Sequence, residues 1–131
     1  MKYFTFDELS RSETAERLKI DNRPSEAAKS NLAALTDNIL DPLREAWGKP
    51  ITVNSGYRCP ALNKAVGGVA TSQHMTGQAA DITTGNKVDN ARLFQLVQDL
   101  GLPFDQLIDE KGFSWVHVSY SPRHGRQILK L

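Results

Sequence analysis

The segment FDQLIDEKGFSWVHVSY, residues 104–120, predicts a β-hairpin. Residues 104–110 and 114–120 are two short runs that mix apolar and polar residues around turn residues, and we read them as strands. Lys111-Gly112-Phe113 separates the two runs, and glycine tolerates the positive φ that tight hairpin turns need. Two antiparallel strands are therefore the expected centre of the fold.

Further short strands and several helices are expected around this hairpin. Apolar residues recur every three or four positions over residues 25–47, which predicts a long helix, and Pro42 predicts a kink or a break near Leu40-Asp41. Tyr3–Phe6 alternates like a short strand or an anchoring arm. The sequence thus predicts an α+β fold, with helices packed on one side of a small, mainly antiparallel sheet. The other expected elements are helices after Ser12, over 61–66 and over 88–100, and strands over 51–53, 79–83 and 127–131.

The composition narrows the classes of function. The chain has 131 residues, 40% hydrophobic and 24% charged, which suits one domain over 1–131, with a helical part at 1–48 and a part rich in glycine and short strands at 49–131. A net charge of +1 disfavours nucleic-acid binding, and no apolar run approaches the roughly 20 residues that membrane insertion needs. The single cysteine excludes an internal disulfide and a cysteine-based zinc site. MKYFTFDELS carries acids where a signal peptide needs an apolar run, so we expect synthesis in the cytoplasm without a signal peptide.

Three histidines are available for chemistry, and two of them can join a carboxylate. Asp81 follows His74 by seven residues and lies among alanines and an isoleucine, where a carboxylate needs a partner. His117 lies in a predicted strand between two valines, whereas His124 lies in a polar loop and is assigned to the surface. Two histidines and a carboxylate form the ligand set of a catalytic zinc, whose fourth position holds water. The spacing alone is a weak pattern, because a lone strand histidine is more often a core or surface residue and an aspartate after alanines can cap a helix.

Three ordered segments carry a resemblance to a known family. SGYRCPALNKAVGG (55–68), SQHMTGQAADI (72–82) and WVHVS (115–119) resemble the signatures of the zinc D-Ala-D-Ala carboxypeptidase family, which shares its fold with the hedgehog signalling domain. TFDELSRSETA (5–15) and NILDPLREAWGKPITVNSGYR (38–58) resemble the phage- and prophage-type branch of that family. The resemblance implies the hedgehog/DD-peptidase fold and hydrolysis of peptides in bacterial peptidoglycan. It also implies one Zn²⁺ ion held by His74, Asp81 and His117.

The sequence offers two candidates for the general base. Some branches of the family place a glutamate three residues before the last ligand, where this chain has Ser114. Glu110 and Asp109, on the preceding strand of the hairpin, are the candidates. An even number of residues in the hairpin loop puts Glu110 on the face of His117, and an odd number puts Asp109 there. We favour Glu110, because Lys111-Gly112 suits a two-residue turn and glutamate reaches further.

Candidate substrate-binding residues surround the ligands. The resemblance implies that Arg58 holds the substrate or stabilises the anionic intermediate, and its guanidinium can bind a carboxylate through two hydrogen bonds. The alternative is a surface arginine paired with an acid. Ser72 and Gln73, just before the first ligand, are candidates to orient the ligand or the substrate. Trp115 and Ser119 share the face of the last ligand. Trp115 is a candidate to line the cleft, although it also suits the core, and Ser119 is a candidate to contact the substrate or the ligand shell.

The expected function is that of a zinc metallopeptidase, a carboxypeptidase or an endopeptidase, acting on peptidoglycan stem or cross-bridge peptides. The alternative, based on the serine at position 114, is a zinc-containing binding module without catalysis, as in the hedgehog branch. A third reading is an α+β domain with no metal. We expect a monomer that acts at the bacterial cell wall, in a phage or prophage setting if the branch resemblance holds.

Overall fold

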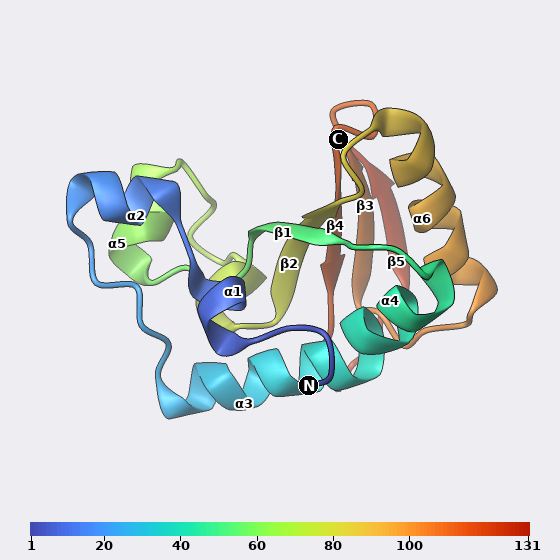
Figure 1. The fold of residues 1–131 in the computed structure, drawn as a ribbon. Helices are drawn as coiled ribbons and strands as arrows, with labels where there is room; N and C mark the ends of the chain where they lie inside the picture. Colours follow the sequence, from blue (N-terminus) through green and yellow to red (C-terminus); the bar gives the residue numbers. More distant parts are fainter.

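The computed structural model describes residues 1–131 and contains a five-stranded sheet in the order β1-β2-β4-β3-β5 (Figure 1). All neighbouring strands are antiparallel except β3 and β5, which run parallel. The expected mainly antiparallel sheet and the edge strand near the end of the chain are confirmed. The strands are β1 (Thr52–Ser55), β2 (Ala79–Thr83), β3 (Gln106–Glu110), β4 (Trp115–Ser119) and β5 (Gln127–Lys130).

The central hairpin of β3 and β4 closes with a longer loop than expected. Glu110 pairs with Trp115, so the loop holds four residues, 111–114, and the predicted two-residue turn is wrong. Lys111, Gly112 and Phe113 all have positive φ, at 51°, 64° and 62°. The Asp109 carboxylate stabilises the loop, because it accepts a hydrogen bond from the Phe113 N–H at 2.6 Å. Four is still an even number, so the faces of the two strands are those of a two-residue turn.

The long helical segment is interrupted before Pro42, as predicted. α3 (Glu26–Leu35) continues into a π-helical segment, Thr36–Leu40, and then into α4 (Asp41–Trp47). The Asp41 N–H donates to the Thr36 carbonyl, five residues back. Proline cannot donate to the carbonyl four residues back and clashes with it, and a π turn widens the helix at that point. The proline therefore lies in the first turn of a new α-helix, where it is tolerated.

The first five residues form an arm and not a strand. The Asp41 carboxylate accepts hydrogen bonds from the backbone N–H groups of Lys2, at 2.6 Å, and Tyr3, at 3.1 Å. These amides are therefore satisfied by a helix side chain, and a strand partner is absent. Thr5 caps α1 (Phe6–Ser10), so the strand alternative for this segment is wrong and the anchoring arm is confirmed.

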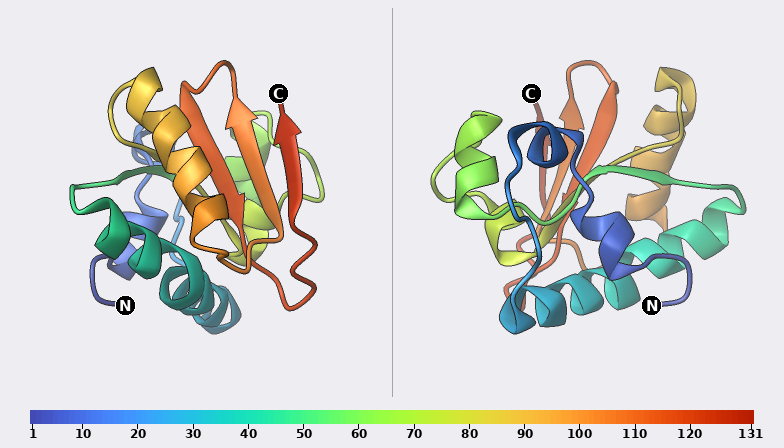
Figure 2. Two further views of the ribbon diagram at one scale, coloured as in Figure 1. Left: turned by 90° about the vertical axis from the view of Figure 1, so that its right-hand side faces the viewer. Right: turned by 60° about the vertical axis from the view of Figure 1, so that its left-hand side comes forward.

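One face of the sheet is covered and the other is open. α6 (Lys87–Asp99) and α4 lie over the first face (Figure 2). There most side chains of β2, β3 and β4 are apolar and fully buried, namely Ala80, Ile82, Leu107, Val116 and Val118, and Asp109 is the buried polar residue among them. They belong to one core with α3 and α4, whose buried residues include Leu32, Leu35, Ile39, Leu40 and Leu43.

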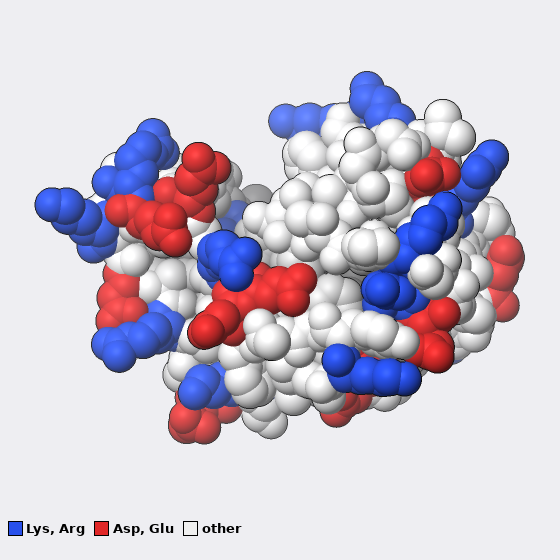
Figure 3. Space-filling view, in the orientation of Figure 1, with Lys and Arg blue, Asp and Glu red and all other residues white.

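Two short helices stand opposite the open face, which corrects the expectation that all helices pack on one side. α2 (Glu13–Leu18) and α5 (Pro60–Ala65) contact each other and lie away from the sheet (Figure 1). The physical reason is the polarity of the open face, which carries Gln106, Glu110, Asp81 and His117 and cannot bury against a helix. A hollow remains between the two parts of the molecule (Figure 3).

Charged side chains are mixed on the surface that Figure 3 presents. Lysine and arginine alternate with aspartate and glutamate across this face, without a broad area of one sign. No helix in the structure combines the length and the apolar character that crossing a membrane requires.

Candidate metal centre

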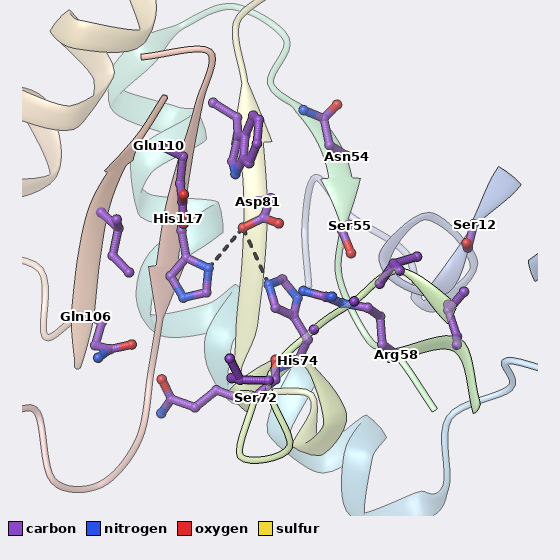
Figure 4. A pocket seen from close by; sticks show the side chains of 18 of the residues that line it. Ser12, Asn54, Ser55, Arg58, Ser72, His74, Asp81, Gln106, Glu110 and His117 are labelled. Atoms are coloured by element: carbon purple, nitrogen blue, oxygen red, sulfur yellow. Dashed lines mark hydrogen bonds and ion pairs between the residues drawn. The ribbon is translucent and has the colours of Figure 1, made fainter. Parts of the chain in front are cut away.

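A cleft of about 1010 Å³ lies between the open face of the sheet and the two short helices α2 and α5. Ser12, Glu13 and Thr14 line it at the start of α2, and Leu62 and Val66 line it on the other helix. The sheet contributes the polar side chains of β2, β3 and β4. At the base of the cleft lie His74, Asp81 and His117 (Figure 4).

His74 is held by its backbone and by one ring nitrogen. It lies on a short 3₁₀ turn, Gln73–Thr76, which the Ser72 hydroxyl caps by accepting a hydrogen bond from the His74 N–H. Its carbonyl accepts a hydrogen bond from the Arg58 N–H at 3.0 Å. Its Nδ1 lies 2.7 Å from the Gly56 carbonyl, and because a carbonyl only accepts, Nδ1 carries the proton. The Nε2 lone pair is therefore available in the cleft.

Asp81 and His117 are direct neighbours across β2 and β4. This register places both side chains on the open face, with His117 Nδ1 2.9 Å from Asp81 Oδ1. His74 Nε2 lies 3.4 Å from the same oxygen. One potential ligand atom from each of the three residues falls within 4.8 Å of the others. The structure thus brings together the three residues predicted as metal ligands.

The charge at this point suits a cation. Burial raises the pKa of the Asp81 carboxyl, but hydrogen bonds and charge from His117 and His74 outweigh it, and the pKa falls below its usual range. The carboxylate is therefore negative at neutral pH. Two imidazole nitrogens and one carboxylate oxygen form a donor set typical of catalytic zinc, and the carbonyl that orients His74 is the kind of outer partner that zinc-binding histidines have.

Glu110 lies in the cleft and Asp109 does not. Glu110 lies on the open face beside His117 (Figure 4), and its carboxylate makes no hydrogen bond or ion pair within the chain. Asp109 is buried on the opposite face, where it stabilises the hairpin loop. The structure therefore leaves only the first of these two acids free to face a substrate.

Arg58 is a cation without an acidic partner. Its guanidinium lines the cleft, forms no ion pair, and has an Nε that is buried with no hydrogen-bond acceptor. Burial lowers its pKa, and the nearby charge of Asp81 offsets part of that effect. The alternative of a surface arginine paired with an acid is wrong, and the unsatisfied guanidinium instead faces the space where a ligand would lie.

The other predicted substrate-binding residues lie in different places. Ser72, Gln73 and Trp115 line the cleft, and the Trp115 Nε1 is buried without an acceptor. The Gln73 side-chain amide is already engaged, since its Nε2 donates to Asp105 at 2.9 Å. Ser119 is fully buried, and its hydroxyl accepts a hydrogen bond from the Gln106 N–H at 3.0 Å. Ser119 is therefore a structural residue, and the structure does not leave it accessible for the expected contact with a substrate.

Sequence reasoning missed much of the cleft wall, including three residues near the metal centre or at the end of the sheet. Gln106 and Ile108 line the cleft because they alternate with Glu110 on the same face of β3, and strand periodicity gives that signal. Arg123, from the polar loop after β4, also lines the cleft. Its position depends on a contact with Asp105, 18 residues earlier, which no local pattern indicates.

Comparison with known proteins identifies the relatives of this chain. A family model described as peptidase M15 matches residues 2–119, which include all three residues at the base of the cleft. The chain belongs to the peptidase M15 family. This confirms the resemblance seen in the cleft motifs. The M15 assignment also agrees with the α+β architecture and with the His-Asp-His cluster on the open face of the sheet.

A curated relative of this M15 chain is the zinc D-Ala-D-Ala carboxypeptidase of Streptomyces albus G. The two sequences are 39% identical over 85 residues, which is 64% of this chain. The matched part is 32% of the relative, so the chain spans about a third of the length of that protein.

Proposed function

We propose that this protein is a zinc-dependent peptidase that hydrolyses peptide bonds in bacterial peptidoglycan, as a D-Ala-D-Ala carboxypeptidase or an endopeptidase. The observation that carries the proposal is the convergence of His74, Asp81 and His117 at the base of a cleft that also holds a free carboxylate and an unpaired guanidinium. Membership of the peptidase M15 family supports peptide hydrolysis. The name of the Streptomyces relative supports zinc and a D-Ala-D-Ala substrate.

Zinc fits the residues at the base of the cleft. His74 would bind it through Nε2, because Nδ1 is engaged with Gly56, and His117 would bind it through Nδ1, the atom that faces Asp81. When bound in such a site, zinc polarises a carbonyl and lowers the pKa of a coordinated water to about 7. The rest of the reaction depends on how the side chains of the chain hold the substrate and move the proton.

Glu110 is the proposed general base and acid. Its unpaired carboxylate lies in the cleft beside His117. From that position it can take a proton from the attacking water and return it to the leaving amine. The position that carries a glutamate in other branches is Ser114, whose hydroxyl donates to the Lys111 carbonyl in the hairpin loop. An acid in the cleft favours the enzyme over the alternative, a non-catalytic binding module.

Arg58 is the proposed anchor for the anionic part of the substrate. A half-buried guanidinium without a partner gains most from a carboxylate or from the negative charge that develops during attack on the carbonyl. The indole N–H of Trp115, also without an acceptor, can donate to a peptide carbonyl in the same cleft. Ser72 orients the turn that carries His74, because its hydroxyl accepts a hydrogen bond from the His74 N–H, and it also lines the cleft where the substrate would lie.

The test is digestion of purified peptidoglycan by zinc-loaded protein, with mass analysis of the products. We expect cleaved stem or cross-bridge peptides, and their masses identify the bond. Glu110→Gln should lose cleavage by about 10²-fold or more while retaining zinc. Glu16→Gln, an exposed acid outside the cleft, is the matched control and should keep full activity. If zinc-loaded protein releases no peptide of any bond type, the proposal is wrong.

The setting of the reaction is part of the proposal. A peptidase of this kind acts where peptidoglycan is, at the bacterial cell wall, and the substrate is a stem or cross-bridge peptide. The phage or prophage setting and the monomeric state stay predictions from the sequence.

A further inference from the structure

A buried carboxylate holds an exposed arginine at one end of the cleft. The side chain of Asp105 is 1% exposed, and that of Arg123 is 74% exposed. Arg123 Nε donates to Asp105 Oδ1 at 3.1 Å and Nη2 donates to Oδ2 at 2.9 Å. Two further donors complete the cluster, the Gly125 N–H at 3.0 Å and the Gln73 Nε2 at 2.9 Å. The carboxylate is therefore satisfied by four hydrogen bonds.

This cluster fixes a side chain that would otherwise move. An exposed arginine normally samples many rotamers, and ordering it is entropically unfavourable. A carboxylate at 1% exposure is also unfavourable, and an apolar residue there would avoid that desolvation. The ion pair holds the guanidinium of Arg123 in one orientation, and stable packing of the fold does not require this. Its Nη1 makes no hydrogen bond within the chain, and the side chain lines the cleft.

Arg123 and Arg58 approach the metal centre from different ends. Asp105 directly precedes Gln106, and Figure 4 shows Gln106 on the side of the two histidines opposite Arg58. The amide of Gln73, next to the first metal ligand, also joins the cluster. Both guanidinium groups line the cleft, and because Arg123 is held by the residue before Gln106, we infer that it lies on the side of the potential metal ligands opposite Arg58.

We propose that Arg123 is a specificity-determining residue that binds a second carboxylate of the substrate, and that Asp105 is the residue that positions it. This inference rests on the proposed function and deepens it. The substrate class is a peptide that carries one carboxylate on each side of the bond to be cleaved. Arg58 binds the group on one side, and the free Nη1 edge of Arg123 binds the group on the other.

The size of the effect follows from the pairing. A hydrogen bond between a fixed guanidinium and a carboxylate in a cleft changes affinity by about 10-fold to 100-fold relative to a neutral partner. Asp105 already neutralises most of the charge of Arg123, so the lower end of this range, about 10-fold, is expected. The preference is for a carboxylate over a carboxamide of the same shape.

The experiment changes the protein and the substrate separately and together, as in a double-mutant cycle. Synthetic stem peptides are prepared in pairs that differ by one carboxylate or carboxamide, on the side of the cleaved bond away from the Arg58 group. With wild-type protein, kcat/KM should favour the carboxylate by about 10-fold. Arg123→Gln should remove that preference, while the control Arg126→Gln, an exposed arginine in the same loop but outside the cleft lining, should retain it. If Arg123→Gln slows both peptides equally and the preference remains, the residue is only structural and the inference is wrong.

A second measurement separates this inference from the proposed function. Zinc-loaded Glu110→Gln protein is titrated with the same peptide pairs by calorimetry, with and without Arg123→Gln. Tighter binding of the carboxylate, lost with Arg123→Gln, supports the inference even if wild-type protein cleaves nothing. Equal binding of both peptides to protein with Arg123 intact overturns it even if cleavage is observed. Asp105→Asn should raise KM for the carboxylate peptide and leave kcat unchanged, since it frees the arginine without removing it.

Discussion

Gly77 ends the turn that carries His74, and replacing it with alanine tests how tightly that turn is built. Its φ is +76°, and a Cβ at this position would lie 2.5 Å from the Ala28 carbonyl oxygen of α3 and 3.1 Å from Leu32 Cγ. The left-handed conformation costs an alanine about 1 kcal/mol. Relieving a contact with a backbone oxygen requires the turn or the helix to shift, which costs about 1–3 kcal/mol more. We therefore expect Gly77→Ala to lower the free energy of unfolding by about 2–4 kcal/mol.

Gly48→Ala is the matched control for this change. Gly48 ends α4 with a φ of +75°, and a Cβ there would meet nothing within 4 Å. Urea unfolding of zinc-free protein should show only the conformational cost of about 1 kcal/mol for the control. A competition titration against a zinc chelator should show affinity lowered about 10-fold to 100-fold in Gly77→Ala alone, because the shifted turn carries a metal ligand. If both variants lose the same stability, the close approach to α3 does not constrain the turn and the reasoning fails.

Three other outcomes are expected. His117→Ala should abolish stoichiometric zinc binding, measured by elemental analysis after dialysis, and retention of one zinc per chain would contradict the assigned ligands. The pKa of Asp105 is lowered to about 2, chiefly by its hydrogen bonds with Arg123. The ionised carboxylate therefore contributes fully to the free energy of unfolding above about pH 4, and this contribution is lost as the pH falls toward 2. Because Arg123 is exposed, it amounts to about 1–2 kcal/mol, and the difference in unfolding free energy between wild type and Asp105→Asn should shrink over that range. Arg58→Gln should lower kcat/KM about 10²-fold or more on peptides with a carboxylate beside the cleaved bond, and an equal effect on the matching carboxamides would show that it does not read that group.

The residues at the base of the cleft could be predicted because local rules fix them. Strand periodicity of two puts Asp81, His117 and Glu110 on one face, and the parity argument for Glu110 over Asp109 needs only an even loop. The predicted loop length was wrong, yet the face was right, since two and four residues give the same parity. The break before Pro42 was likewise local, because it follows from the missing N–H and the ring of proline.

The rest of the cleft depends on contacts that no local pattern specifies. Contacts between segments that are distant in the sequence place α2 and α5 across from the open face. Ser12 lines the cleft only because of this tertiary packing. Arg123 was not singled out from the sequence, because the carboxylate that fixes it lies on another segment. Ser119 shares strand parity with His117, but the backbone of β3 covers it, which periodicity along one strand does not reveal.

The three potential ligands differ in how much order a metal would add to them. Asp81 and His117 lie on strands that pair with each other in the sheet, so their positions are set by the core. His74 comes from the connection between β1 and β2, which is tied back by a few hydrogen bonds to Gly56 and Arg58. A bound metal ion would therefore link the connection between β1 and β2 to a sheet that is already formed. Its binding energy would oppose local opening of that segment more than global unfolding. Removal of the metal should therefore first increase the amide hydrogen exchange of residues 56–78.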